Sequence, residues 1–283
     1  MIRVLKDQFR IRSMCRWLAV SPSGYYAWRG RSSSERRRQN ERLAFEMRVI
    51  HRRVRQSYGS VRMHEELLGR GFKCGHNRVA RLMRSEGLRA KRSQRFKVTT
   101  RAGGMRTGPD RVKRCFTAPA PNRVWVSDIT AILTAEGWLY LAVILDLYSR
   151  RVVGWSMHHR LHAQLVVDAV NHAAARRSLA PGWIFHSDRG VQYTSVLLKE
   201  RVSQLQGLTS MSRIGNCYDN AVAESFFASL KEEWICGTVY ATRKEGRRDV
   251  FEYIELFYNP ARRHSTLGYV SPAQFELRTG TSN

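Results

Sequence analysis

The chain has 283 residues, of which 43% are apolar, so it can form one large core or two to three small ones and is not a disordered protein. Its formal charge of +26 is unevenly distributed. Residues 1–120 carry 31 Lys and Arg against 8 Asp and Glu, whereas residues 121–283 carry 18 against 15. This asymmetry predicts a nucleic-acid-binding region joined to a domain with another task.

Cysteine usage and hydropathy exclude several other classes. The five cysteines form no C-x-x-C pair, so neither a disulfide framework nor a four-cysteine zinc site is expected. No apolar run approaches 18 residues, and the N-terminus lacks a signal-peptide pattern. We therefore expect a cytoplasmic protein that makes no use of a membrane.

Residues 1–41 form a predicted basic N-terminal helical segment. Within it, residues 9–28 predict two short helices, the second capped by Ser21 with Pro22 in its first turn. A helix-turn-helix and a helical pair that only packs on its neighbours are both compatible with this pattern. The stretch from Arg29 to Arg42 is expected to be a polar, strongly basic connector.

Residues 42–90 predict a second helical unit, and 91–120 a basic linker that follows DNA backbone. In the last helix of this unit, near residues 77–86, the apolar side chains fall on one face at helical spacing. Another face of this helix carries Arg78, Arg81 and Arg84. These arginines suit contact with phosphates or base edges, and a merely solvated charged face is the alternative.

The pattern changes after Pro121. Three consecutive β-rich runs, VWVSDITAIL, GWLYLAVILDLYS and RVVGWSM, predict a strand meander. A helix from about residue 163 to 177, a short buried strand in WIFHSD, and helices at 196–205 and 220–234 follow. Residues 246–283 add a further helix and a turn capped at Ser271. Residues 121–283 are therefore expected to form one α/β domain with a mixed sheet covered by helices.

Three carboxylates in this domain point to its chemistry. Asp128 lies in VWVSDIT, Asp188 in FHSDRGVQYTS and Glu224 in NCYDNAVAESFFASLKEEW, with Lys231 seven positions later. A site that cuts or joins phosphodiesters with two divalent metals needs several carboxylates from separate elements, because hard cations prefer oxygen ligands. Each residue has a structural alternative: a strand-end aspartate, a turn aspartate, and a surface Glu and Lys at helical spacing.

At these residues the chain resembles the transposases of the IS-three family of bacterial insertion sequences, specifically the downstream-frame protein OrfB. The resemblance rests on NRVWVSDITAI, GWLYLAVILDLYSRRVVGW, FHSDRGVQYTS, GNCYDNAVAESFFASLKEE and YNPARRHSTLGYVSPAQFE. Upstream, YGSVRMHEELLGRGFKCGHNRVARLMRSEGLRAK and MCRWLAVSPSGYYAW are also similar to this family.

The resemblance implies a ribonuclease-H-like, retroviral-integrase-type core with a mixed five-stranded sheet, preceded by a small all-α helix-turn-helix region. It implies that Asp128, Asp188 and Glu224 hold two Mg2+ ions, for which Mn2+ substitutes, in a DDE mechanism of end cleavage and strand transfer. Lys231 would reach the DNA. Arg262 and Arg263 form a basic tip that either contacts DNA or is a solvated cluster.

The resemblance also implies partners: terminal inverted repeats, target DNA, and the upstream-frame protein OrfA, joined to OrfB by frameshifting. A homo-multimer would hold both ends together, at the bacterial nucleoid. Two alternatives remain open. One is a DNA-binding regulator whose catalytic half is dead, and the other is a ribonuclease-H-like nuclease or resolvase that cuts without joining.

Overall fold

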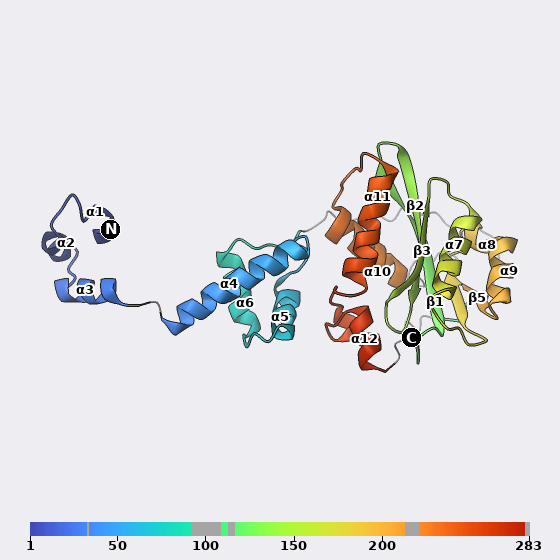
Figure 1. Cartoon of the computed structure of the whole chain (residues 1–283), viewed down its shortest axis with the longest axis horizontal. Coiled ribbons are helices and arrows are strands. Elements are labelled where there is room, and N and C mark those ends of the chain that lie inside the picture. The colour runs from blue at the N-terminus through green and yellow to red at the C-terminus, as the bar shows by residue number, and fades with distance from the viewer. Residues whose placement is uncertain (33, 92–108, 113–116, 213–220, 281–283) are drawn as a thin grey trace. The chain divides into compact units, whose positions relative to one another are not determined.

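The computed structural model describes residues 1–32, 34–91, 109–112, 117–212 and 221–280 (Figure 1). Contacts divide the chain into two compact units, Met1–Arg48 and Val49–Asn283, each considered by itself. Most of the predicted linker at 91–120 lies outside the described residues. No described helix is long and apolar enough to cross a membrane.

The first unit is helical. It contains α1 (Ile2–Leu5), α2 (Ile11–Trp17), α3 (Pro22–Gly30) and the beginning of α4 (Glu35–Arg53). A small cluster is buried among the first three helices and includes Ile2, Met14, Cys15 and Tyr25. The predicted cap of α3 is confirmed, because the Ser21 hydroxyl accepts a hydrogen bond from the Gly24 N–H at 2.9 Å.

The expected connector from Arg29 to Arg42 is wrong, because α4 already begins at Glu35. Its Glu, Gln and Arg residues are good helix formers. The Ser34 hydroxyl accepts from the Arg37 N–H at 3.3 Å, and Arg37 pairs with Glu41 one turn later at 3.0 Å. The high density of charged residues is therefore no evidence against a helix, because opposite charges spaced one helical turn apart stabilise it.

The second unit opens with a helix-turn-helix arrangement. It is formed by α5 (Ser60–Gly69) and α6 (His76–Ser85). Their facing apolar side chains are buried: Met63, Leu67, Val79, Leu82 and Met83. The amphipathic pattern predicted for the second of these helices is confirmed.

A five-stranded mixed sheet forms the centre of the α/β part of the second unit, as expected. Its strands are β1 (Val124–Thr134), β2 (Gly137–Asp146), β3 (Val152–His158), β4 (Ile184–Ser187) and β5 (Leu208–Met211). They lie in the order β3-β2-β1-β4-β5. The first three are antiparallel, which confirms the meander, and β4 and β5 are parallel to β1.

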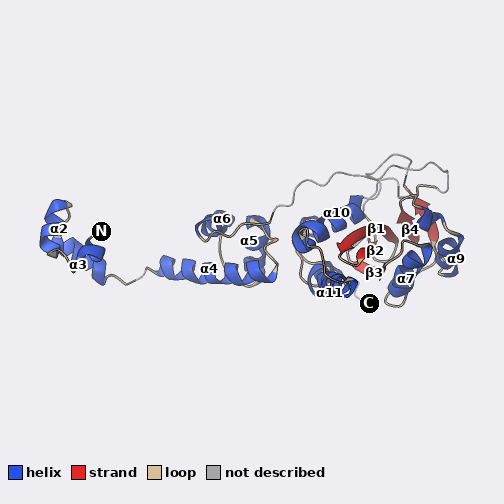
Figure 2. Cartoon of the chain, turned by 90° about the horizontal axis from the view of Figure 1, so that it is seen from above, coloured by secondary structure: helices blue, strands red, loops and turns tan. Residues whose placement is uncertain are grey.

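Helices cover both faces of this sheet (Figures 1 and 2). On one face lie α7 (Ala163–Ala174), α8 (Val191–Thr194) and α9 (Val196–Gln204). On the other lie α10 (Ala221–Ser229), the π-helix η2 (Leu230–Ile235), α11 (Arg243–Phe251) and a second π-helix, η3 (Glu252–Tyr258). Regular helices were expected at η2 and η3.

The main core lies between the sheet and α7. Trp125 and Trp183 are fully buried there, with ring centroids 4.7 Å apart. Gly154 on β3 allows α7 to approach closely, because a Cβ at this position would overlap the carbonyl oxygen of Ala169 and the Cβ of Ala173. The core therefore covers one face of the sheet, and α10 lies on the opposite face.

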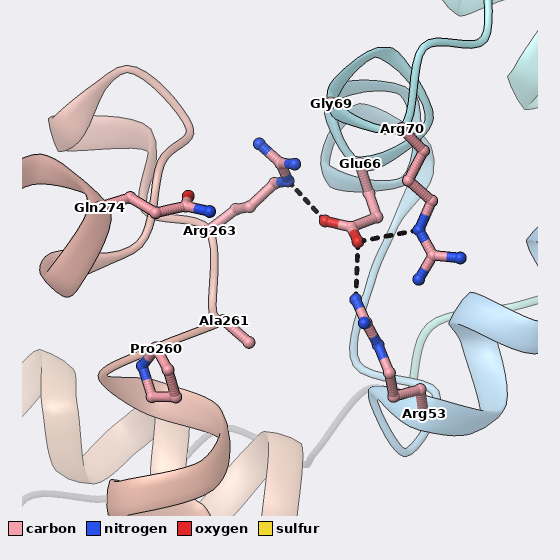
Figure 3. Close-up of a pocket in the computed structure, with 8 residues that line it drawn as sticks. All are labelled: Arg53, Glu66, Gly69, Arg70, Pro260, Ala261, Arg263 and Gln274. Carbon is pink, nitrogen blue, oxygen red and sulfur yellow. Dashed lines mark hydrogen bonds and ion pairs between the residues drawn. The ribbon is translucent and has the colours of Figure 1, made fainter. Parts of the chain in front are cut away.

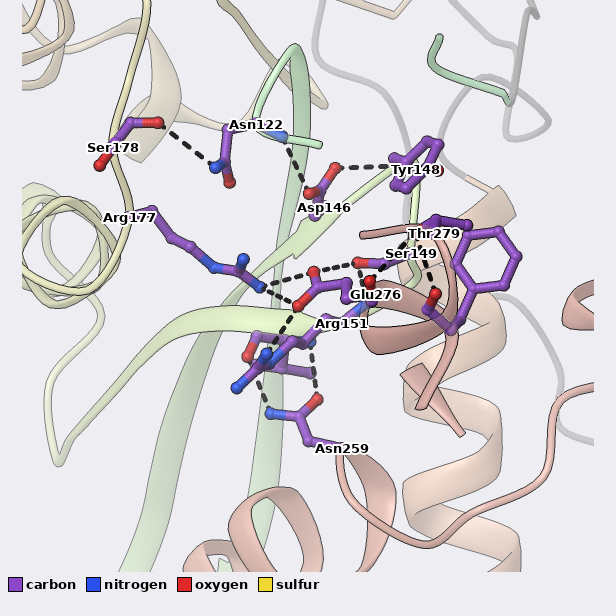
Figure 4. Close-up of polar contacts among 12 residues, drawn as sticks. Asn122, Asp146, Tyr148, Ser149, Arg151, Arg177, Ser178, Asn259, Glu276 and Thr279 are labelled. Carbon is purple, nitrogen blue, oxygen red and sulfur yellow. Dashed lines mark hydrogen bonds and ion pairs between the residues drawn. The ribbon is translucent and has the colours of Figure 1, made fainter. Parts of the chain in front are cut away.

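The C-terminal tail closes the domain through a buried polar network (Figure 4). After the short helix η4 (Ser265–Leu267), a capping box at Ser271 starts α12 (Pro272–Arg278), which extends the predicted capped turn into a helix. Glu276 of α12 is fully buried and accepts from Arg177 at 2.7 and 3.0 Å and from Arg151 at 2.6 Å. The network ties α12 to the β2–β3 connection.

Asp146, at the end of β2, has a structural role. Its carboxylate accepts from the backbone N–H groups of Asn122 and Tyr148 at 2.9 and 3.0 Å (Figure 4). Burial raises its pKa to about 6, although these two hydrogen bonds act in the opposite direction. This carboxylate therefore organises the strand end.

Candidate active site

Asp128 and Asp188 lie on neighbouring parallel strands. The register of β1 and β4 pairs Val126 with His186 and Ser127 with Ser187. Asp128 and Asp188 directly follow the last paired residues, Ser127 and Ser187. The two aspartates therefore lie side by side where the pairing of β1 with β4 ends. Because side chains alternate along a strand, Asp128 faces away from the core residue Trp125 and toward the α10 side.

Glu224 and Lys231 come from the helices on that side. Glu224 lies in the first turn of α10, which packs on β1 and β2, and Lys231 lies in η2, directly after α10. The charges that act on Asp128 are those of Asp188, Glu224 and Lys231. The structure thus brings together the four residues that the sequence singled out, although they span about a hundred positions.

The electrostatics of this group are unbalanced. Burial, followed by the negative charges of Asp188 and Glu224, raises the pKa of Asp128 to about 7, and Lys231 only partly opposes this. Burial also raises the pKa values of Asp188 and Glu224 and lowers that of Lys231. Three carboxylates facing one lysine leave an excess of negative charge, which a bound cation would neutralise.

The donor set suits a hard divalent ion, because all three acidic side chains offer oxygen ligands. Among the residues that the structure describes, however, no three His, Cys, Asp or Glu side chains form a group that would hold a metal as they stand. Asp188 is held by the Gly190 N–H at 3.0 Å, and Asp128 by the Ile129 N–H at 2.8 Å. Glu224, on a separate helix, is the exposed member of the group.

Tyr193 is a further part of the site that sequence reasoning passed over. It is buried on α8, its hydroxyl lies 3.1 Å from the Ser127 hydroxyl, and its pKa is raised well above its usual range by burial and then by Asp128. Its place in FHSDRGVQYTS, five positions after Asp188, was the available signal. Tyr193 supports the strand end that carries both aspartates.

The arginines expected to contact DNA fall into two groups. On α6, Arg81 and Arg84 are exposed on the face opposite the apolar one, and Arg78 is half-buried at the edge of the apolar face. Arg262, by contrast, is only 4% exposed and donates two hydrogen bonds of 2.6 Å to Glu233.

Arg263 donates to Glu66 at 2.7 Å and to the Tyr269 carbonyl at 2.7 Å. The guanidinium groups of Arg262 and Arg263 bind protein carboxylates, so these residues do not form the solvated cluster that was one alternative, and their contact with DNA stays a prediction. Asp219, which the sequence suggests as the cap or first-turn acid of the helix at 220–234, lies outside the described residues.

Models of known protein families match most of the chain. Models of the integrase core domain match residues 118–217 and 224–279, and a model of an HTH-like domain matches residues 38–96. The fold and site thus define a transposase of the integrase-core class, an enzyme of the polynucleotidyl transferase type.

Relatives with long alignments narrow the class. The chain is 44% identical over 272 residues to the transposase InsF for insertion sequence IS3A of Escherichia coli (strain K12), covering 95% of this chain and 94% of that protein. It is 42% identical over 263 residues to the insertion element IS600 uncharacterized 31 kDa protein of Shigella sonnei, covering 93% and 97%. The chain belongs to the IS3 family of insertion-sequence transposases.

Two solved structures that match this chain have lower sequence identity to it than these relatives. The catalytic core domain of BIV integrase matches with a TM-score of 0.42 and 16% identity, covering 56% of this chain and 96% of that chain. The HTLV-2 integrase catalytic core domain in complex with magnesium matches with a TM-score of 0.41 and 13% identity, covering 56% and 97%.

Proposed function

We propose that this transposase cleaves the ends of its insertion sequence and joins them to target DNA by a DDE two-metal mechanism. The observation that carries the proposal is the convergence of Asp128, Asp188 and Glu224 on one face of the sheet, where burial, followed by the charges of Asp188 and Glu224, raises the pKa of Asp128 to about 7. Such mutual repulsion is costly without a cation and typical of a functional site.

In this proposal Asp128, Asp188 and Glu224 hold two Mg2+ ions, or Mn2+ in their place. Bound there, the ions would activate the attacking water or DNA 3'-hydroxyl and stabilise the leaving 3'-oxygen. Asp128 and Asp188 keep fixed positions through β1 and β4. Glu224 would complete the ligand set by a small movement of α10, since it is exposed and carried by a different element.

Lys231 would bind a phosphate next to the cleaved bond. It is half-buried beside Asp128, so its ammonium group lies near the carboxylates, and its positive charge would balance that of a phosphodiester. No covalent enzyme intermediate is required, because water and then the DNA 3'-hydroxyl serve as nucleophiles. In the joining step one phosphodiester is exchanged directly for another, so that step needs no external energy source.

The basic first part of the chain would supply most of the DNA affinity. We propose that Arg78, Arg81 and Arg84 on α6 contact the terminal inverted repeats. In the proposed domain division, residues 1–41 are an N-terminal segment and residues 42–90 the HTH-like domain. Residues 91–120 are a linker, and residues 121–283 are the catalytic domain. The active species would be a homo-multimer that holds both ends of the insertion sequence together. It would act at the nucleoid in the cytoplasm, with the upstream-frame protein OrfA fused to this chain.

A strand-transfer assay on labelled end DNA with Mg2+ tests the catalytic assignment. We expect Asp188→Asn to abolish cleavage and joining while end-DNA affinity changes less than about twofold, because phosphate contacts elsewhere supply affinity. Asp168→Asn, an exposed aspartate on α7, is the matched control and should retain activity. The chain alone and its fusion to the upstream frame are assayed in parallel.

Three other outcomes of this assay would each support a different conclusion. Joined product that persists in Asp188→Asn contradicts the DDE assignment. Metal-independent binding without cutting in any form of the protein would favour a regulator with a dead catalytic half. Cutting without joined product would favour a nuclease or resolvase.

A further inference from the structure

Two arginines of the HTH-like part reach the π-helix η2 of the catalytic domain. Arg62 of α5 donates to Glu233 at 2.7 Å, and the guanidinium of Arg55 lies over the Trp234 ring, 3.8 Å from its centroid. Arg55 also pairs with Asp249 of α11 at 2.8 Å. Two consecutive residues of η2 are thus held by arginines of the HTH-like part, one through charge and the other through a cation–π contact.

The same two residues are anchored from within the catalytic domain. Arg262 binds both oxygens of Glu233 and also donates to the Ser229 hydroxyl, the last residue of α10, at 2.9 Å. Burial alone would raise the pKa of Glu233, but Arg262 and Arg62 outweigh it and the pKa is lowered. The Glu233 carboxylate is therefore ionised and pairs with one arginine from each domain, Arg62 and Arg262.

Trp234 is held in a similar way. Its indole N–H donates to the Asp249 carbonyl at 3.0 Å, and its ring stacks on Phe257 of η3 with centroids 5.1 Å apart. The two π-helices thus pack against each other, with the Arg55 guanidinium on the Trp234 ring. π-Helical turns are uncommon and frequently lie at functional sites.

A second contact reinforces the same docking (Figure 3). Glu66 of α5 accepts from Arg263 at 2.7 Å, and from Arg53 and Arg70 at 2.6 and 3.2 Å. The Tyr58 hydroxyl accepts from the Arg263 N–H at 3.0 Å. The Arg262–Arg263 segment, which the sequence offered as either a DNA contact or a solvated cluster, is where the HTH-like part docks.

The geometry points to a positioning role: Arg55 and Arg62 of the HTH-like domain hold η2, and thereby set the place of Lys231 relative to Asp128 in the active site. Lys231 lies only two residues before Glu233 on the same π-helix, and α10, which bears Glu224, ends at Ser229. This inference rests on the proposed function of Lys231 and Glu224. It makes the domain that recognises the end a supporting part of the catalytic site.

The consequence of losing one contact follows from its burial. With Arg62 removed, Glu233 keeps Arg262, so the catalytic core should fold. The π-helix would lose its restraint on one side, however, and a displacement of about 1 Å at a reacting group can cost up to a hundredfold in rate. Substrate affinity has no reason to change by more than the loss of one positive charge.

The test compares Arg62→Met with Arg52→Met in the full chain. Arg52 is exposed on α4 and its substitution removes the same charge, so it is the matched control. We expect the single-turnover joining rate at saturating end DNA to fall on the order of tenfold in Arg62→Met and less than twofold in Arg52→Met. End-DNA Kd should change equally in the two variants. Equal joining rates would overturn the inference.

A second readout is independent of activity. With 5-fluorotryptophan in the seven tryptophan positions, the 19F signal of Trp234 can be assigned by Trp234→Phe. We expect Arg55→Met and Arg62→Met to shift this signal and Arg52→Met to leave it unchanged. An unmoved Trp234 signal in both variants would disprove the docking. If joining persists in Asp188→Asn, the proposed function falls, and the 19F shift still decides whether the arginines dock on η2.

Discussion

At the scale of single residues, the candidate site is a place where the protein accepts a cost in stability. Asp128 lies in a strand otherwise rich in Val, Ile and Trp, and it faces two other carboxylates. Burying a charge near like charges is unfavourable unless it is paired. Natural active sites commonly carry such a cost, and relieving it tends to stabilise the fold at the expense of activity.

This argument predicts that Asp128→Asn stabilises the metal-free protein in a pH-dependent way. The pKa of Asp128 is raised from 3.8 to about 7, so the folded state prefers the protonated form. The wild type should therefore lose stability as pH rises from about 4 through 7, and Asp128→Asn should not. Because the side chain is half-buried, we expect a gain of about 1–2 kcal/mol at pH 8 and little gain at pH 5. Urea unfolding in EDTA at the two pH values measures it, and an equal gain at both would contradict the assignment.

At the scale of secondary-structure elements, one helix can serve two partners. On α6, Val79, Leu82 and Met83 are buried against α5, while Arg81 and Arg84 are exposed. The apolar face holds the helix in the fold, and the basic face is left for phosphate or base edges. The π-helix η2 shows the same division, because Leu230 and Ile235 are buried while Lys231 faces the site and Glu233 faces the HTH-like part.

For α6 we predict that Arg81→Ala weakens binding to end DNA and lowers the slope of log K against log salt by about one. Fluorescence anisotropy over a salt series measures both quantities. Lys244→Ala, an exposed lysine on α11, removes the same charge from the catalytic domain and is the control. If both variants lose the same affinity with the same slope, the Arg81 face of α6 is merely solvated.

At the scale of the whole molecule, the fold is completed by contacts between residues far apart in sequence. The C-terminal helix α12 carries Glu276 into a fully buried position, where it meets Arg151 and Arg177 more than ninety residues away (Figure 4). A buried ion pair is weak evidence of net stabilisation, but removing one member leaves an uncompensated charge. The tail is therefore required for the sheet end that Asp146 organises.

We predict that Glu276→Gln lowers the free energy of unfolding by about 3 kcal/mol, because the Arg177 guanidinium, whose side chain is 4% exposed, loses its carboxylate. Glu200→Gln, at an exposed position of α9, should change it by less than about 0.5 kcal/mol. Denaturant unfolding of both variants provides the comparison. An unchanged midpoint in Glu276→Gln would show that solvent replaces the lost partner.

The sequence by itself determined the local elements and the chemistry. Period-two runs located β1, β2 and β3, and helical spacing located α6 and α7. The motifs around Asp128, Asp188 and Glu224 named the residues that the β1–β4 register and the packing of α10 bring together. These signals are readable because they depend on neighbours in the chain: alternation along a strand, apolar residues one helical turn apart, a cap before a helix.

Only the tertiary structure decided where the long charged side chains end. Arg262 and Arg263 look like a solvent-facing basic cluster in sequence, yet they bind Glu233 and Glu66, the latter 197 positions away. The π-helical turns and the docking of Arg55 on Trp234 likewise depend on packing between distant segments. An arginine can bind a carboxylate or a phosphate equally well, and which of them lies within its reach is a property of the folded chain, because burial and partner geometry are set by long-range contacts.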